Sequence, residues 1–187
     1  MKEVIEGIEL VRALYCDGGV IQKNPSAIGG TWAWCGTDEN GTRIVRRGGF
    51  VPANGRFITN NLTEYIAATL ALEAMPEGWS GKLHSDSQIT LGRLFWRWRN
   101  KNLPTNVYSR GMAAVERLGK VEPVLLQGHP TKADLACGIG KKRGLPVSIH
   151  NVWCDHECGR QAQLFLETQT KDIMAAQIAE RTALCSH

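Results

Sequence analysis

Four acidic residues lie at the ends or starts of segments of this sequence that are expected to be strands or helices. Asp17 closes an apolar run and precedes two glycines, and Asp86 follows a second short segment that is expected to be a strand. Glu64 lies at the start of an apolar helical pattern, and Asp155 opens the last such pattern. Because burying an unpaired carboxylate is costly, an acid that ends an apolar strand requires a cation, a metal ion or water in a cleft.

Carboxylates from four separate elements are suited to divalent-metal chemistry. A cluster close enough for mutual repulsion is stable only with bound cations, and ligands that offer oxygen alone favour Mg²⁺ or Mn²⁺. Two such ions ~3.5 to 4 Å apart clamp a phosphodiester, one activating water and the other stabilising the leaving oxygen. The four acids together therefore indicate metal-dependent nuclease chemistry.

Taken singly, the acids also have structural interpretations. An Asp before Gly is common at the start of a turn, so Asp17 alone indicates only a turn. Asn61 is expected to cap a helix, and Glu64 then falls three residues later, where the glutamate of a capping box belongs.

Hydrophobic periodicity predicts the elements that must position these acids. Alternation with a period of two predicts strands, and recurrence at helical spacing predicts helices. The expected strands span 14–19, 29–37, 42–51, 81–84 and 121–127. The expected helices span 62–75, 89–98, 107–118 and about 155–182, the last with a potential break at 168–170. The first three strands form an antiparallel meander, and each acid comes from a different element.

Composition limits the class of protein. A chain of 187 residues with 43% hydrophobic content is long enough for one buried domain and short for two. The N-terminal region is interrupted by Glu3, Glu6 and Glu9, and no apolar run approaches membrane-spanning length. We therefore expect a cytoplasmic monomer with no membrane contact, whose cysteines are reduced and mostly in the core. The net charge of +4 permits a polyanionic partner without requiring one.

Several short motifs follow one another in a fixed order. They are Asp17-Gly18-Gly19, Asn24-Pro25, Thr59-Asn60-Asn61-x-x-Glu64, Ser85-Asp86-Ser87-Gln88, Gly128-His129 and Cys154-Asp155. In this order, and with these expected elements, they resemble type 1 ribonuclease H over about residues 14–162. The resemblance implies an α/β fold (α+β in some schemes) of the ribonuclease H-like type, with a five-stranded mixed sheet, antiparallel strands 1-2-3 and helices on both faces.

The resemblance also implies an activity and a set of site residues. It implies that Asp17, Glu64, Asp86 and Asp155 hold two catalytic Mg²⁺ ions, with Mn²⁺ as the alternative metal. The implied reaction is internal cleavage of the RNA strand of an RNA/DNA hybrid, leaving 5'-phosphate and 3'-hydroxyl ends. Amide side chains suit the hybrid's wide minor groove, because they donate and accept hydrogen bonds there without reading sequence. The residues implied to contact substrate are Asn24, Thr59, Asn60, Asn61 and Gln88, for which loop and cap chemistry is the alternative.

Two features depart from the family pattern. The family has a loop histidine shortly before its last Asp, which assists proton transfer or product departure. His129 matches it by motif but lies 26 positions before Asp155, whereas His150 lies only five before. The family's basic handle is represented here by a compact set that includes Arg97 and Arg99, for which a solvated helix face is the alternative. The whole set is Arg93, Trp96, Arg97, Arg99 and Lys101.

The inserted segment 130–149 separates the motif histidine from the last acid. It is rich in Gly and basic residues, and three interpretations stay open: a nucleic-acid contact, a lid over the site, or a surface excursion. We expect one ribonuclease H-like domain over residues 1–187, with its core at about 12–168 and a helical extension at 169–187. In the helix 89–98, Leu91, Leu94 and Trp98 are expected to face the core and the arginines to point away.

Three further interpretations remain for the sequence. Cys154 and Cys158 could share a helical face as zinc ligands, but His156 would point away from them. A protein of the same fold that cuts or joins DNA would use a similar acidic cluster, although the Thr-Asn-Asn and Asp-Ser-Gln contexts oppose this. A hybrid-binding module without catalysis is the third, and the presence of all four acids opposes it.

Overall fold

Five strands form one mixed sheet in the order β3-β2-β1-β4-β5. The computed structural model describes residues 5–184, and the side chains of residues 5–170. The strands are β1 (Ala13–Val20), β2 (Gly29–Thr37), β3 (Arg43–Pro52), β4 (Gly81–Ser85) and β5 (Val121–Leu125). The pairs β1·β2 and β2·β3 are antiparallel, whereas β4 lies parallel to both β1 and β5. The predicted fold class, including the antiparallel meander, is confirmed.

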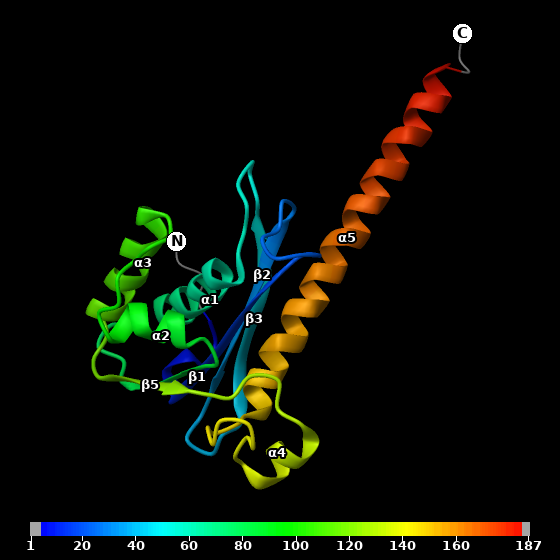
Figure 1. Ribbon diagram of the computed structural model, residues 1–187. Helices are drawn as coiled ribbons and strands as arrows, with labels where there is room; N and C mark the ends of the chain where they lie inside the picture. The colour runs from blue at the N-terminus through cyan, green and yellow to red at the C-terminus, as the bar shows by residue number, and fades with distance from the viewer. Residues whose placement is uncertain (1–4, 185–187) are drawn as a thin grey trace.

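Helices cover both faces of the sheet (Figure 1). The helices are η1 (Ile8–Leu10), α1 (Asn60–Ala74), α2 (Gln88–Phe95), α3 (Thr105–Glu116), α4 (Lys132–Cys137) and α5 (Ile149–Leu184). In Figure 1 α1, α2 and α3 lie on one side of the sheet and α5 crosses the other. At about 1.5 Å per residue, the 36 residues of α5 span about 54 Å, and the helix extends well past the sheet.

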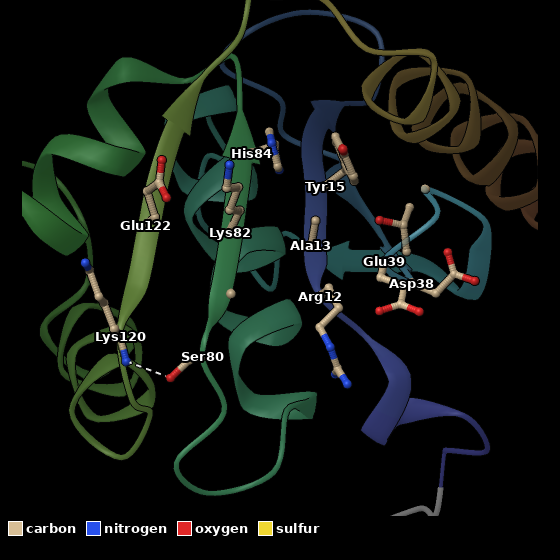
Figure 2. Close-up of a pocket in the computed structure, with 13 residues that line it drawn as sticks. Arg12, Ala13, Tyr15, Asp38, Glu39, Ser80, Lys82, His84, Lys120 and Glu122 are labelled. Atoms are coloured by element: carbon tan, nitrogen blue, oxygen red, sulfur yellow. Dashed lines mark hydrogen bonds between the residues drawn. The ribbon is translucent and has the colours of Figure 1, made fainter.

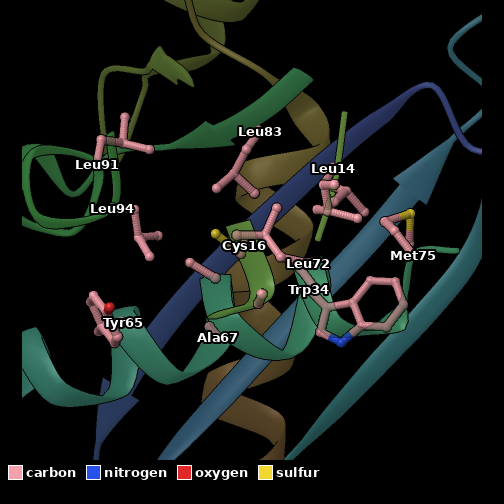
Figure 3. Packing of buried hydrophobic residues seen from close by; sticks show 14 of the residues in the cluster. Leu14, Cys16, Trp34, Tyr65, Ala67, Leu72, Met75, Leu83, Leu91 and Leu94 are labelled. Atoms are coloured by element: carbon pink, nitrogen blue, oxygen red, sulfur yellow. The ribbon is translucent and has the colours of Figure 1, made fainter. Parts of the chain in front are cut away.

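The main core fills the space between the sheet and α1 to α3 (Figure 3). Leu14, Cys16 and Leu83 from the strands meet Leu72 of α1 and Leu91 of α2, and all five are fully buried. Because β1 contacts α1 on one face and α5 on the other, any polar group on it is positioned by rigid neighbours on each side.

The start of α1 differs from the prediction. Thr59, not Asn61, is the N-cap, and its side chain accepts a hydrogen bond from the N–H of Leu62. Glu64 therefore lies two residues beyond the position that a capping-box glutamate occupies. The structural interpretation of Glu64 is wrong, and its carboxylate is not used to cap the helix.

The end of α2 also differs. The helix stops at Phe95 instead of Trp98, because Arg97 adopts φ +56° and reverses the chain. Trp98 then folds back against Gly92, where a Cβ would lie 2.3 Å from its ring, and Trp98 is 42% exposed. Arg93, expected to point away, is buried. The sequence pattern missed this reversal because nothing local marks Arg97 as left-handed.

Three smaller differences concern the rest of the chain. Gly18 and Gly19 lie within β1, so they form no turn after Asp17. The segment 130–149 contains the unpredicted helix α4. Helix α5 begins at Ile149, six residues earlier than expected, and continues without a break through 168–170. The predicted extension 169–187 is described as far as Leu184, and residues 185–187 lie outside the described part.

Five cysteines fall within the described residues, and all five are free thiols. Four of them are buried and Cys137 is exposed, while Cys185 lies outside the described part. Across residues 5–184, none of the helices combines the length and the apolar character needed to cross a membrane.

Candidate functional site

Asp17 lies inside β1 and is only 8% exposed. Its Oδ1 accepts a hydrogen bond from the N–H of Gly18 at 2.7 Å. A Cβ at Gly18 would lie 2.2 Å from the backbone nitrogen of Glu64. Glycine at this position therefore allows the first turns of α1 to press against β1, which brings Glu64 next to Asp17.

Glu64 has an environment that favours its neutral form. Burial raises the pKa of Glu64 from 4.5 to about 7, with a further raising contribution from the charge of Asp86. A hydrogen bond with the Ser87 side chain and the positive charge of Arg93 oppose the rise in this pKa. The carboxylate thus faces a neighbouring acid with incomplete compensation from donors and cations.

Asp86 lies in the junction between β4 and α2. Burial raises the pKa of Asp86, and Asp155 adds to the rise, whereas His129 and a hydrogen bond with Asn151 lower it. A Cβ on Gly128 would lie 2.3 Å from Asp86 Oδ2, so the chain that leaves β5 passes directly over the carboxylate. A side chain at position 128 would therefore force the Asp86 carboxylate to move.

Asp155 is held in place by thiols on either side of it. The Cys154 thiol donates to the backbone oxygen of Tyr15, and the Cys158 thiol donates to that of Asp17, both at 3.4 Å. The Cys154 Sγ also lies 4.0 Å from Cys35 Sγ of β2. These contacts fix the first turns of α5 on β1 and set the height of Asp155 above the strand that carries Asp17.

His129 and Asp155 face each other across a cleft. His129 Nδ1 lies 3.5 Å from Asp155 Oδ2, and the side chains are 81% and 43% exposed. A cavity of about 230 Å³ opens there. Its lining residues are Asp86, His129, Pro130, Asn151, Val152, Asp155 and His156. The cleft therefore reaches from solvent to Asp86.

The four acids interact electrostatically as one group. Burial raises the pKa of Asp17 well above its usual value, and the charges of Asp86, Glu64 and Asp155 raise it further. Within the described residues, no three His, Cys, Asp or Glu side chains are arranged to hold a metal ion as they stand. The donor set itself fits a hard divalent cation, because it consists of carboxylates whose repulsion such a cation would relieve.

Comparison of the whole chain with known proteins gives matches among solved structures. No family model and no curated protein matches the sequence. The N-terminal RNase H domain of Rv2228c from Mycobacterium tuberculosis superposes with a TM-score of 0.61 at 14% identity, covering 85% of this chain and 99% of that one. This chain has a ribonuclease H-like fold.

Two further structures share the ribonuclease H-like fold. RNase H1 from Halobacterium salinarum NRC-1 gives a TM-score of 0.52 at 22% identity, covering 62% of this chain and 85% of that one. LC11-RNase H1, isolated from compost, was solved in complex with RNA/DNA hybrid. That complex gives a TM-score of 0.50 at 21% identity, covering 62% of this chain and 85% of the other.

The two histidines proposed as alternatives lie in different surroundings. His129 contacts Asp155, as described above. The ring of His150 lies 4.8 Å from that of Tyr15, and burial together with the charge of Arg43 lowers the pKa of His150. The structure therefore brings His129, and not His150, to Asp155, while the role of His129 stays a prediction.

The predicted substrate residues gather around the starts of α1 and α2. Asn24 Oδ1 accepts a hydrogen bond from the N–H of Asn60 at 3.4 Å, which ties the loop after β1 to the first turn of α1. Thr59 and Asn61 line a cavity of about 170 Å³. Gln88 is exposed in the first turn of α2. Their roles in substrate binding stay predictions.

The basic handle is irregular, because Arg93 is buried and its other four residues are exposed. Arg97 and Arg99 lie in the loop after α2, with Trp96 and Trp98 tilted against each other at 5.9 Å between ring centroids. This loop is not a helix face, so the alternative of a solvated helix does not describe it. No described contact joins Arg97 or Arg99 to the four acids.

Sequence reasoning missed Asn151 and placed Arg93 in the basic handle instead of beside Glu64. Asn151 is 3% exposed, shares a hydrogen bond with Asp86, and precedes Asp155 by one helical turn. That i, i+4 spacing on a helix was the available signal. Arg93 is 6% exposed and lines the cavity with Thr59 and Asn61, and its charge lowers the pKa of Glu64. An arginine between two core leucines gave no comparable signal.

The zinc alternative finds no support from contacts. The thiols of Cys154 and Cys158 both donate to carbonyl oxygens of β1, and His156 is exposed on another side of α5. Both thiols have raised pKa values, with burial as the main cause, so neither readily supplies the thiolate that zinc requires.

Proposed function

We propose that this protein is an endonuclease that hydrolyses the RNA strand of RNA/DNA hybrids with divalent metal. The observation that carries the proposal is the acid group at β1, α1, the β4–α2 junction and α5. Burial and mutual repulsion raise the pKa of Asp17, Glu64 and Asp86 together. Groups that disfavour one another's charge at a cleft are typical of a site that is completed by a cation.

In this proposal Asp17, Glu64, Asp86 and Asp155 would hold two Mg²⁺ ions, or Mn²⁺ in their place. Bound metal would supply an activated water and stabilise the oxygen that leaves the RNA strand. Asn151 would orient Asp86 through their shared hydrogen bond, as supporting residues of metal ligands do. One chain carries the full acid set, so the proposed metal site needs no residue from a second subunit.

His129 has the position of a proton carrier in the proposed reaction. Its Nδ1 faces Asp155 Oδ2, and its side chain is largely open to solvent. It would exchange a proton with the departing 3'-hydroxyl end and with water, which accelerates product departure and leaves the new 5'-phosphate on the other fragment.

The substrate class rests on the amides near the acids and on one relative. Asn24, Asn60, Asn61 and Gln88 offer donors and acceptors suited to 2'-hydroxyls and base edges in a minor groove, without base specificity. LC11-RNase H1, which shares the fold, was solved with an RNA/DNA hybrid. These observations favour hybrid over the DNA substrate of a strand-transfer protein.

The test compares labelled RNA/DNA hybrid with duplex DNA, with Mg²⁺ and with EDTA. We expect internal cuts in the RNA strand alone, lost on chelation. Asp86→Asn should abolish cleavage while hybrid binding persists, and Glu122→Gln is the matched control, since Glu122 is an exposed acid on β5. Cleavage of duplex DNA would favour the strand-transfer alternative, binding without cleavage would favour the silent module, and full activity of Asp86→Asn would refute the site.

A further inference from the structure

A tight basic turn lies within the inserted segment. Lys141, Lys142 and Arg143 occupy its tip, and all three are exposed. The chain is closed beneath them by a bridge between Ile139 and Pro146. Two backbone hydrogen bonds at 2.9 Å, from Gly140 N–H to Leu145 O and from Gly144 N–H to Gly140 O, complete the turn. We call residues 141–143 the basic turn.

The basic turn is attached to the residue that precedes the cleft. Gln127 Oε1 accepts a hydrogen bond from the N–H of Arg143 at 3.0 Å, and the N–H of Gln127 donates to Pro146 O at 2.9 Å. Gly140 packs directly on this amide, since a Cβ there would lie 2.2 Å from Gln127 Cδ. Gln127 is buried and adjoins Gly128, which lies over Asp86. The turn is thus held at a fixed place beside the acids.

Helix α4 supplies a second attachment. Asp134 accepts hydrogen bonds from the N–H and the hydroxyl of Thr131 and from the N–H of Lys141. The cleft residues Pro130 and Asn151 bracket the inserted segment at its two ends. Figure 1 shows the segment beside the first turns of α5, the helix that carries Asp155. All of these contacts use backbone groups of the turn, so its cationic side chains are left to face solvent.

The charge of the basic turn is poorly balanced within the molecule. Lys141 lies near Asp134, so its charge is partly compensated. For Lys142 and Arg143, no ion pair or side-chain hydrogen bond occurs among the described residues. A second cationic area lies on the sheet face shown in Figure 2, where Lys82 and Lys120 alternate with acids. The acids there are Asp38, Glu39 and Glu122, so that face has no excess of positive charge.

We propose that the basic turn is a binding site for the phosphate backbone of nucleic acid that leaves the cleft on the His129 side. This inference rests on the proposed function in so far as the partner is a nucleic acid. Exposed, unpaired cations at a fixed position release counterions when they meet phosphates, and they lose little backbone entropy on doing so. Of the three interpretations of the insertion, the nucleic-acid contact is the one that its anchoring and charge support.

The experiment measures the salt dependence of hybrid binding by the full chain, in the Asp86→Asn background so that the hybrid stays intact. The test variant carries Lys142→Glu and Arg143→Glu, and the matched control carries Lys82→Glu and Lys120→Glu with the same change in net charge. Binding weakens as salt rises, so the slope of log K against log salt is negative. Each lost phosphate contact makes this slope shallower by about one. For the test variant we expect a slope that is shallower by about two. At about 0.1 M salt, its hybrid affinity should fall on the order of tenfold for each of the two lost contacts.

Two further measurements separate this inference from the proposed function: the dependence of cleavage on hybrid length, and the separate effects on KM and kcat. With Asp86 intact, the test variant should raise KM for long hybrid with kcat unchanged, and the effect should vanish on a hybrid too short to pass α4. Equal salt slopes in the test and control variants overturn the basic turn as a contact site. Binding without cleavage by the parent would overturn the enzyme and leave the slope comparison valid, and a parent that binds no nucleic acid overturns both.

Discussion

The two sides of the acid cluster are built differently. Asp17 and Glu64 lie where β1 and α1 press together, under a core that allows no side chain at Gly18. Asp155 and His129 lie on the rim, where their side chains are 43% and 81% exposed. The buried side is positioned by packing and bears the desolvation, whereas the rim side is positioned by a few hydrogen bonds and stays accessible to water. A site of this kind is fixed where charge must be concentrated and open where product must leave.

The largest contrast is expected from neutralising one acid on each side. Glu64→Gln should lower cleavage by more than the roughly 10- to 100-fold typical of losing a supporting residue, because a direct ligand is removed. In metal-free protein it should also raise the free energy of unfolding. The raised pKa of Glu64 makes its ionised form destabilising, so the gain reaches up to about 3 kcal/mol above pH 7 and disappears below the usual value of 4.5.

Asp155→Asn is the comparison on the rim. It should reduce cleavage as well, but change the free energy of unfolding by only about 0.5 kcal/mol or less, since its side chain is 43% exposed. Urea unfolding in EDTA at two pH values measures both variants. Equal stabilisation by Glu64→Gln and Asp155→Asn would remove the distinction between the two sides.

The next effect concerns the histidine on the rim. His129→Ala should lower kcat by roughly 100-fold or more with little change in hybrid affinity, because it removes a proton carrier beside Asp155 and no packing contact. His150→Ala is the matched control and should leave kcat nearly unchanged. If instead His150→Ala gave the larger loss in single-turnover assays, the role would belong to His150 despite its contact with Tyr15.

A smaller effect is expected from the thiols that join the two sides. Cys158→Ala removes the hydrogen bond to the backbone oxygen of Asp17, and should destabilise by about 1 kcal/mol and raise the Mg²⁺ concentration needed for half-maximal rate. Cys158→Ser keeps a donor and should restore the Mg²⁺ dependence. A loss of stability with no change in Mg²⁺ dependence would mean that Cys158 contributes only to packing.

The smallest effect concerns the inserted segment. Hydrogen bonds from Lys141 and Thr131 lower the pKa of Asp134 below its usual 3.8. A lowered folded pKa stabilises the segment fully above the unfolded value, and this stabilisation is lost as pH falls below it. Hydrogen exchange of the Lys141 amide should therefore quicken, relative to global unfolding, below about pH 3.8, and in Asp134→Asn already at neutral pH. Unchanged exchange in both cases would show that Asp134 does not hold the segment.

Sequence patterns predicted the elements best where a regular alternation of apolar and polar residues marks a strand. The strands β1 to β5 were predicted to within a few residues, because alternation along a strand is enforced by burial on one or both faces. Patterns failed where the conformation or capping role of a single residue, and not a periodicity, sets the end of a helix. The early end of α2 depends on Arg97 and on the packing of Trp98 against Gly92, and the cap at Thr59 shifted the interpretation of Glu64.

The amino-acid sequence by itself determined the order of the five strands and of α1, α2, α3 and α5, the candidate set of four acids, and the presence of a basic insertion before the last helix. Only the tertiary structure decided that His129 rather than His150 contacts Asp155 and that Asn151 forms a hydrogen bond with Asp86. It also decided that the thiols of α5 donate hydrogen bonds to backbone oxygens of β1. The physical reason is that hydrophobic periodicity is a local property of the chain. The approach of two polar groups from distant segments depends on how closely backbones can pack, and here Gly18 allows α1 to lie directly on β1.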